Sequence, residues 1–160
     1  MLLWFVGTSV ATVWMVFRDP RFDYRPLIAG ALLPDVIDVW SGGAWAMHSV
    51  IVAMGGVILV MLATIGRRPV RRLLLAVPIG MLLHLVFDAA FADADVFWWP
   101  LGGAATGAQL PVAGRGWWNV VLEGAGVAII AFGVRKFGLL DPTRRRRFLA
   151  DGRLEPLVEV

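Results

Sequence analysis

Cysteine is absent from this 160-residue chain. Its absence excludes disulfide bonds, thiolate metal sites and cysteine nucleophiles. Charged residues are also scarce: they make up 17% of the chain, whereas a soluble domain is about one quarter charged. Hydrophobic residues reach 59%, the mean hydropathy is +0.74, and the apolar residues gather in long runs. This distribution is typical of a membrane protein.

The apolar residues form five runs, which span 1–17, 27–40, 44–66, 73–91 and 117–134. The first run has no basic residue before it and lacks a convincing small-residue cleavage site, so we expect a retained helix rather than a signal peptide. Gly7 and Ala11 in this run are spaced for close contact between helices. We predict an all-α membrane bundle over residues 1–136 and a basic cytoplasmic tail over 137–160.

The second run is the least regular of the five. Its 14 residues would span about 21 Å as a helix, which is short of a bilayer core of about 30 Å. Pro34 should break or bend that helix. The run is therefore either a short, kinked helix that only just crosses the membrane or a re-entrant segment buried in protein.

Basic residues lie almost entirely between the runs. Segments 18–26, 67–72 and 135–160 contain 3, 4 and 7 of them, which is 14 of the 15 Lys and Arg residues. If all five runs cross the membrane, these segments share one side and only Arg115 lies opposite. Because basic loops stay in the cytoplasm, we expect the N-terminus outside and the C-terminus inside. The tail is expected to contact anionic membrane lipids, and we predict no nucleic-acid partner.

Six ionisable side chains interrupt the apolar runs, and none of them is Lys or Arg. They are Asp35, Asp38, His48, His84, Asp88 and Glu123. Counted from the outer ends under the five-crossing topology, all six lie about 5 to 10 Å inside the membrane. Asp35 and Asp38 are three residues apart, and His84 and Asp88 are four apart, so each pair can share a helix face. Ionisable groups at such depth are costly and tend to mark a functional site.

The chemistry of these side chains favours a bound cation. Four carboxylates close together in a low dielectric need either protons or a cation. Histidine and carboxylate suit a divalent metal ion: Zn is expected first, with Mn or Fe as alternatives. Such an ion can activate water, and a remaining carboxylate can act as general base. We assign the base to Glu123 and expect Arg115, the one cation on the outer side, to hold a phosphate.

Simpler roles remain open for several of these residues. Asp35 and Asp38 lie near a helix end and can be capping or turn residues. Glu123 can face the aqueous mouth of the bundle and pair with Arg115. Ser49 is expected to be a small packing residue, because adjacency to a histidine in sequence is not the geometry of a catalytic triad.

Four short motifs occur in the order and spacing of a known bacterial family. They are Gly30-Ala-Leu-Leu-Pro-Asp35-Val-Ile-Asp38, His48-Ser49, Gly80-Met-Leu-Leu-His84-Leu-Val-Phe-Asp88 and Phe97-Trp-Trp-Pro100. Together they resemble the YdjM-like family of small, inner-membrane, metal-dependent hydrolases. The likeness covers about residues 27–101. It implies a multi-pass protein of the bacterial inner membrane.

The resemblance also implies a metal-binding set, which is Asp35, Asp38, His48, His84 and Asp88. The chain departs from the family pattern at two places. Many relatives have a histidine near the N-terminus, but none precedes His48 here. Residues 44–47, Ala-Trp-Ala-Met, stand where the family often has Arg-Gly-x-Thr. Glu123 is our candidate to replace the missing histidine.

The leading hypothesis is a metal-dependent hydrolase that acts on a lipid-linked phosphoester or ester near the outer interface. The expected site lies at headgroup depth beside the aromatic-rich loop 92–116, which suits a lipid-like substrate. A transporter that binds a proton or metal ion is one alternative, but the inner halves of the runs carry no ionisable side chain and few polar ones, such as Thr12 and Thr64. A non-catalytic membrane scaffold is another. The sequence does not predict the oligomeric state.

Overall fold

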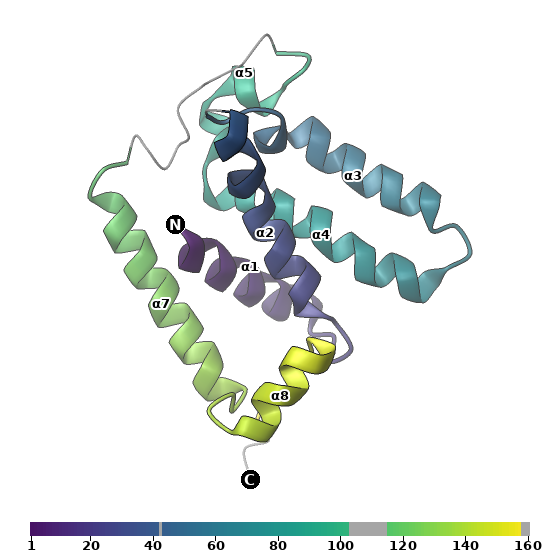
Figure 1. Ribbon diagram of the computed structural model, residues 1–160, viewed down its shortest axis with the longest axis vertical. Coiled ribbons are helices and arrows are strands. Elements are labelled where there is room, and N and C mark those ends of the chain that lie inside the picture. Colours follow the sequence, from purple (N-terminus) through teal and green to yellow (C-terminus); the bar gives the residue numbers. More distant parts are fainter. Residues whose placement is uncertain (42, 103–114, 158–160) are drawn as a thin grey trace.

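The computed structural model describes residues 1–41, 43–102 and 115–157, and within these ranges every regular element is a helix (Figure 1). The predicted all-α class is therefore confirmed. The α-helices are α1 (Leu2–Phe17), α2 (Tyr24–Asp38), α3 (Val50–Ala63), α4 (Arg68–Phe87), α5 (Ala94–Phe97), α7 (Trp118–Lys136) and α8 (Pro142–Asp151). Three 3-10 turns also occur, at Val39–Ser41, Ala46–His48 and Ala90–Ala92.

Two of the described helices are long and apolar enough to cross a membrane. They are α4, with 20 residues, and α7, with 19. Helices α1 and α3 are apolar but shorter, and α2 has 15 residues. Length and composition thus support a membrane protein, while a bundle of five crossings goes beyond what they establish.

Two predicted boundaries differ from the structure. The run 44–66 becomes a helix of only 14 residues, α3, because the Ser49 side chain caps it by accepting the N–H of Ile51. The preceding residues form a 3-10 turn instead of a helical extension. Pro34 lies inside α2 without breaking it, since the helix continues to Asp38.

Helices α2 and α4 form the most extensive helix pair, and two glycines allow their backbones to meet. A Cβ atom on Gly30 would overlap the carbonyl oxygen of Val77 in α4. A Cβ atom on Gly80 would overlap the carbonyl oxygen of Leu27 in α2. The two helices therefore cross at backbone contact, which sets the distance between the side chains that follow each glycine.

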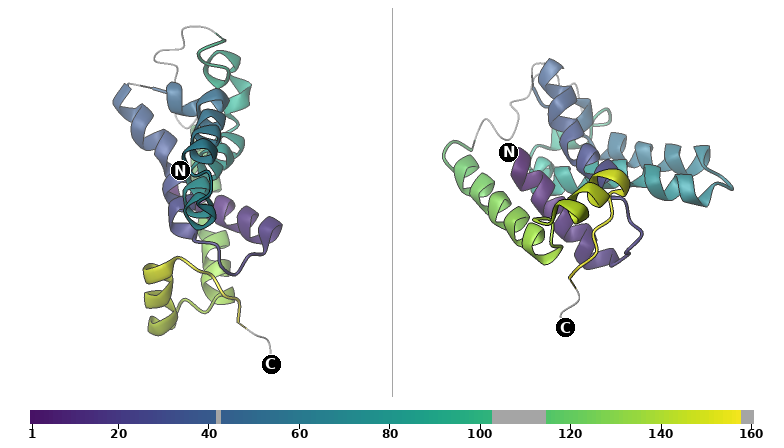
Figure 2. Two further views of the ribbon diagram at one scale, coloured as in Figure 1. Left: turned by 90° about the vertical axis from the view of Figure 1, so that its right-hand side faces the viewer. Right: turned by 60° about the horizontal axis from the view of Figure 1, so that its bottom comes forward.

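A second close pair joins α1 and α7, which lie side by side (Figures 1 and 2). A Cβ atom on Gly7 would lie 3.1 Å from the carbonyl oxygen of Gly126, and one on Gly126 would overlap the backbone of Trp4. The prediction that Gly7 makes a close helix contact is confirmed.

Helix α8 folds back onto the start of α2 (Figure 2). The Arg25 guanidinium donates to the carbonyl oxygens of Leu149 and Ala150 at 3.0 and 2.7 Å. Leu154 shares a buried apolar cluster with Tyr24 of α2. The described part of the predicted tail thus packs against α2.

Candidate metal centre

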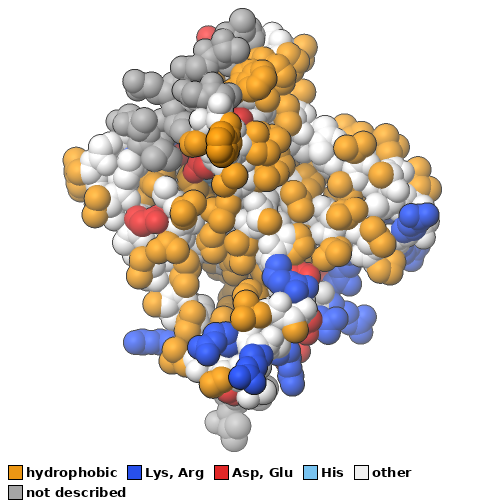
Figure 3. Space-filling model, in the orientation of Figure 1, with side chains coloured by type: hydrophobic (Ala, Val, Ile, Leu, Met, Phe, Trp, Pro, Cys, Tyr) orange, Lys and Arg blue, Asp and Glu red, His pale blue; other side chains and the backbone are white. Residues whose placement is uncertain are grey.

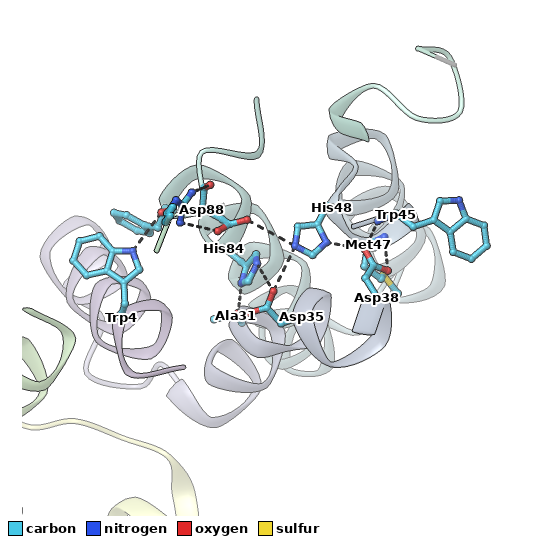
Figure 4. A network of polar contacts seen from close by, with 11 residues as sticks. Trp4, Ala31, Asp35, Asp38, Trp45, Met47, His48, His84 and Asp88 are labelled. Atoms are coloured by element: carbon cyan, nitrogen blue, oxygen red, sulfur yellow. Dashed lines mark hydrogen bonds and ion pairs between the residues drawn. The ribbon is translucent and has the colours of Figure 1, made fainter. Parts of the chain in front are cut away.

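Three side chains from three elements converge near one end of α4 (Figure 4). Asp35 comes from α2, His48 from the 3-10 turn before α3, and His84 from α4. The Asp35 Oδ1 atom lies 3.5 Å from Nε2 of His48 and 3.6 Å from Nε2 of His84. One ligand atom of each residue lies within 4.8 Å of the other two. We call these residues the Asp–His–His group.

His48 is held from behind by Asp38. The His48 Nδ1–H donates to Oδ2 of Asp38 at 2.7 Å, and both side chains are buried. The Asp38 carboxylate also accepts the backbone N–H groups of Trp45 at 2.9 Å and Met47 at 3.3 Å. These contacts orient the imidazole and direct its Nε2 toward Asp35. Asp38 was predicted as a metal ligand. In the structure it contacts Nδ1 of His48, whereas the Asp–His–His group involves Nε2 of that ring.

His84 is oriented by a backbone group of α2. Its Nδ1–H donates to the carbonyl oxygen of Ala31 at 2.7 Å, and its ring packs 4.0 Å from that of Phe5. His84 lies one helical turn after Gly80, whose backbone contact with α2 brings Ala31 within reach. The sequence could not predict this hydrogen bond, because every residue has a backbone carbonyl that can accept one.

The facing atoms of the group have no hydrogen-bond partner. Asp35 Oδ1, His48 Nε2, His84 Nε2 and Asp88 Oδ2 are all buried without one. A buried polar atom left unpaired costs about 1–3 kcal/mol, so the three such atoms of the Asp–His–His group, which lie within 4.8 Å of one another, call for a shared partner. Imidazole Nε2 and carboxylate oxygen are ligands for a divalent cation such as Zn²⁺. The residues present therefore fit a metal ion.

Asp88 lies beside the Asp–His–His group and is held by Arg115. Its Oδ2 is 3.8 Å from Nε2 of His48, while Oδ1 accepts from Arg115 Nη1 at 3.0 Å. Arg115 Nη2 also donates to the Asp88 carbonyl oxygen. The partner of Arg115 is therefore Asp88 and not Glu123, with which the sequence left a pairing open. Its role in holding a phosphate stays a prediction.

The structure places Glu123 elsewhere. Its two carboxylate oxygens accept the backbone N–H groups of Leu3 at 3.2 Å and Trp4 at 3.3 Å. N–H groups in the first turn of a helix have no acceptor within that helix. The Glu123 side chain of α7 therefore caps the N-terminal end of α1. Both oxygens of the predicted general base therefore hold α1 against α7 rather than facing the Asp–His–His group.

Ser49 has a larger role than the packing residue predicted. Its hydroxyl donates to the carbonyl oxygen of Trp99 at 2.5 Å and also lies 3.3 Å from that of Phe97. Ser49 therefore ties the start of α3 to the segment after α5. Its place directly before an apolar helix was a capping signal in the sequence.

A cavity of about 410 Å³ opens beside His48. Its lining residues are Ala44, His48, Ala89, Ala90, Ala92, Asp93, Val96 and Arg115. The lining is mostly of small apolar side chains, with His48, Asp93 and Arg115 as the polar groups. A ligand in this cavity would therefore meet the edge of the Asp–His–His group and a guanidinium together.

Comparison with known proteins adds no relative. The chain matches no known family model, and no curated protein or solved structure is similar to it. Functional inference therefore depends on the geometry of the site and on the motifs that build it.

Proposed function

We propose that the chain is a membrane-bound, metal-dependent hydrolase that acts on a lipid-linked phosphoester or related ester. The observation that carries the proposal is the convergence of three unpaired ligand atoms, Asp35 Oδ1, His48 Nε2 and His84 Nε2, within 4.8 Å of one another. Three protein ligands with room for a further one are typical of catalytic zinc sites. The resemblance of the motifs to the YdjM-like hydrolases supports the same assignment.

Placement in a membrane is supported by apolar surface that the protein leaves uncovered. Leu59 of α3 is 67% exposed, and Val120 and Phe132 of α7 are 75% and 63% exposed. Uncovered apolar faces of this extent are costly in water and harmless in lipid. A membrane around these helices accounts for them.

The proposed orientation follows from the two ends of α4. Arg71 and Arg72 lie near its first residues, whereas His84 and Asp88 lie at its last turn. Figure 3 shows Lys and Arg side chains along the lower and right-hand margins of the molecule, around α8 and the α3–α4 turn. With the basic end in the cytoplasm, the Asp–His–His group is near the outer interface.

The proposed chemistry uses Asp88 and Arg115. When bound, a divalent metal would polarise the ester and make a coordinated water acidic. Asp88 Oδ2 is unpaired and lies beside His48, so it is the atom that accepts the proton of the attacking water. The water oxygen then bonds to phosphorus as the bond to the leaving oxygen breaks. Arg115, held by Asp88 through Nη1, presents its remaining N–H groups to a phosphoryl oxygen.

The cavity suits the ester end of a lipid. Its volume of about 410 Å³ falls in the range of small-ligand sites. Trp45, next in sequence to the lining residue Ala44, packs edge to face against Trp99, with ring centroids 5.7 Å apart. Tryptophan pairs of this kind favour the headgroup region of a bilayer. The substrate class is therefore a phosphoester or ester whose apolar part stays in the membrane.

The first test is the metal content of the purified protein by elemental mass spectrometry. Wild type should carry a stoichiometric transition metal, and His84→Ala should lose it while remaining inserted and helical by circular dichroism. Asp95→Asn removes an exposed carboxylate of α5 and should keep the metal. Retention in His84→Ala, or no metal in wild type, would contradict the metal site and favour the transporter or scaffold alternatives.

The second test separates catalysis from metal binding. Asp88→Asn should keep the metal but lower hydrolysis of lipid phosphoesters by about 10²–10⁴-fold, the range expected for loss of a general base. An equal loss in Asp95→Asn, or full activity in Asp88→Asn, would remove Asp88 from the reaction.

A further inference from the structure

A second cavity lies at the opposite end of the molecule from the metal group. It has a volume of about 570 Å³ and runs between α1, α7 and α8. Val10 and Trp14 of α1 line one side, and Ile129 and Phe132 of α7 line the other. The lining is almost wholly apolar along the two helices. We call this cavity the α1–α7 groove.

The groove ends at two basic side chains. Lys136 is the last residue of α7, and Arg145 belongs to α8. Both side chains line the cavity. The Lys136 ammonium lies 4.3 Å from the ring centroid of Trp14 and 5.5 Å from that of Phe132. Within the described part of the chain, neither cation forms an ion pair with a carboxylate, whereas Arg25, Arg72 and Arg115 do. The groove therefore combines an apolar channel with unneutralised positive charge at one end.

We propose that the α1–α7 groove binds an anionic glycerophospholipid of the cytoplasmic leaflet. An acyl chain would lie along the apolar sides between α1 and α7, and the phosphate would meet Lys136 and Arg145. Basic pockets between helices on the cytoplasmic side recognise anionic headgroups in this way. The proposal rests on the membrane placement above and is independent of the metal and of hydrolysis.

The orientation of α8 matches this ligand. Its basic residues lie at the margin where Figure 3 shows the Lys and Arg side chains, which is the proposed cytoplasmic side. Leu149 of α8 is 65% exposed, so the helix offers both charge and apolar surface to the lipid interface. A zwitterionic lipid would fill the apolar part equally well, but the ammonium of its headgroup would bring a third positive charge close to Lys136 and Arg145 and weaken the net attraction.

A glycine helps to keep the groove open. Gly133 of α7 lines the cavity, and a Cβ atom there would meet only the ring of Phe137, at 3.9 Å. A larger side chain at this position can therefore enter the groove without displacing backbone. Gly124, on the same helix, has no atom within 4 Å of its Cβ position and does not line the groove, which makes it a matched control.

Native mass spectrometry of the full chain tests the proposal. The protein is released from detergent after addition of either phosphatidylglycerol or phosphatidylcholine, and the two lipids have identical acyl chains. We expect wild type to retain phosphatidylglycerol at least about 10-fold better than phosphatidylcholine. The double variant Lys136→Gln/Arg145→Gln should lose that preference, and Arg147→Gln should keep it. Gly133→Leu should lower retention of both lipids at least about 10-fold, and Gly124→Leu should not.

Equal retention of the two lipids by wild type would overturn the proposed site. Retention of phosphatidylglycerol at the wild-type level in Lys136→Gln/Arg145→Gln, or in Gly133→Leu, would overturn it as well. Metal content of every variant is measured in parallel. It should equal that of wild type, because none of the substituted residues touches the Asp–His–His group. Loss of lipid with retained metal separates this proposal from the proposed function.

Discussion

Two aspartates of one motif take different roles at the level of single residues. Asp35 presents an unpaired oxygen to the two histidines, whereas Asp38 accepts the Nδ1–H of His48 from the far side. A carboxylate behind a histidine ligand fixes its tautomer and increases its basicity. We therefore expect the two residues to contribute to metal affinity by different amounts.

Isosteric substitutions measure this difference. Asp35→Asn should abolish stoichiometric metal binding, because it removes a ligand charge. Asp38→Asn should weaken binding only about 10–100-fold, the usual effect of losing an outer-shell partner. Competition with a chromophoric chelator gives both affinities, with Asp95→Asn as the control. Complete loss in Asp38→Asn would place Asp38 among the ligands, as the family resemblance implies.

At the level of elements, the α2–α4 crossing sets the geometry of the site. Gly30 and Gly80 allow backbone contact, and Ala31 and His84 meet beside that contact. A side chain at either glycine would separate the helices and move His84 from Asp35.

Gly30→Ala should therefore destabilise the fold by more than about 4 kcal/mol, or prevent its accumulation, because the added Cβ meets backbone that cannot yield. Gly55→Ala in α3 is the control, since no atom lies within 4 Å of its Cβ position. It should be neutral or stabilising by up to about 1 kcal/mol. Thermal unfolding in detergent measures both, and equal midpoints would contradict the backbone contact.

The docking of α8 onto α2 is a second feature at this level, and it depends on pH. Burial, the largest single effect, raises the pKa of Asp23. Hydrogen bonds from the side chain and backbone of Arg25, together with the charges of Arg25 and Arg153, outweigh it, so the pKa lies below its ordinary value. A pKa that is lower in the folded state gives stability that is present above the unfolded pKa and is lost as pH falls through the folded pKa.

Hydrogen exchange of α8 amides tests this linkage. Asp23→Asn should lower their protection about 2- to 5-fold at about pH 7, a modest effect because the Arg25 pair is partly exposed. The difference from wild type should shrink as the pH falls below the ordinary range of an aspartate and Asp23 becomes protonated in the folded state as well. A difference that persists at low pH would assign the effect to packing, and Asp95→Asn should match wild type throughout.

At the scale of the whole molecule, the number of crossings is the property to measure. Because the chain has no cysteine, single introduced cysteines report membrane sidedness without background. Trp40, which is 88% exposed, separates two topologies. Five crossings place it outside, whereas a topology in which α4 and α7 alone cross places it inside.

We expect Trp40→Cys and Ala94→Cys to react with an impermeant maleimide in intact spheroplasts. Ile65→Cys and Glu155→Cys should react only after the membrane is opened. Protection of Trp40→Cys while Ala94→Cys reacts would exclude five crossings. It would also be hard to reconcile with the structure, in which His48, close to Trp40 in sequence, lies 3.8 Å from Asp88 at the C-terminal end of α4, the end that both topologies place outside.

The sequence by itself predicted the helical class, which the structure confirms, and proposed Asp35, His48 and His84 among the metal ligands. Asp35, His48 and His84 stand out because ionisable groups are costly within apolar runs and persist there only for a reason. The loop arginines likewise predicted an orientation, because charge along the chain needs no knowledge of packing.

Only the tertiary structure decided which groups face one another. Asp38 and Asp88 are as prominent in the sequence as Asp35, but the turn after α2 places His48 between Asp35 and Asp38. Glu123 looked like a site residue at the same depth and instead caps α1. Coordination depends on distances of a few ångströms between atoms on different helices. Those distances depend on how closely the helix backbones cross. The spacing of residues along one helix does not determine how closely that helix approaches another.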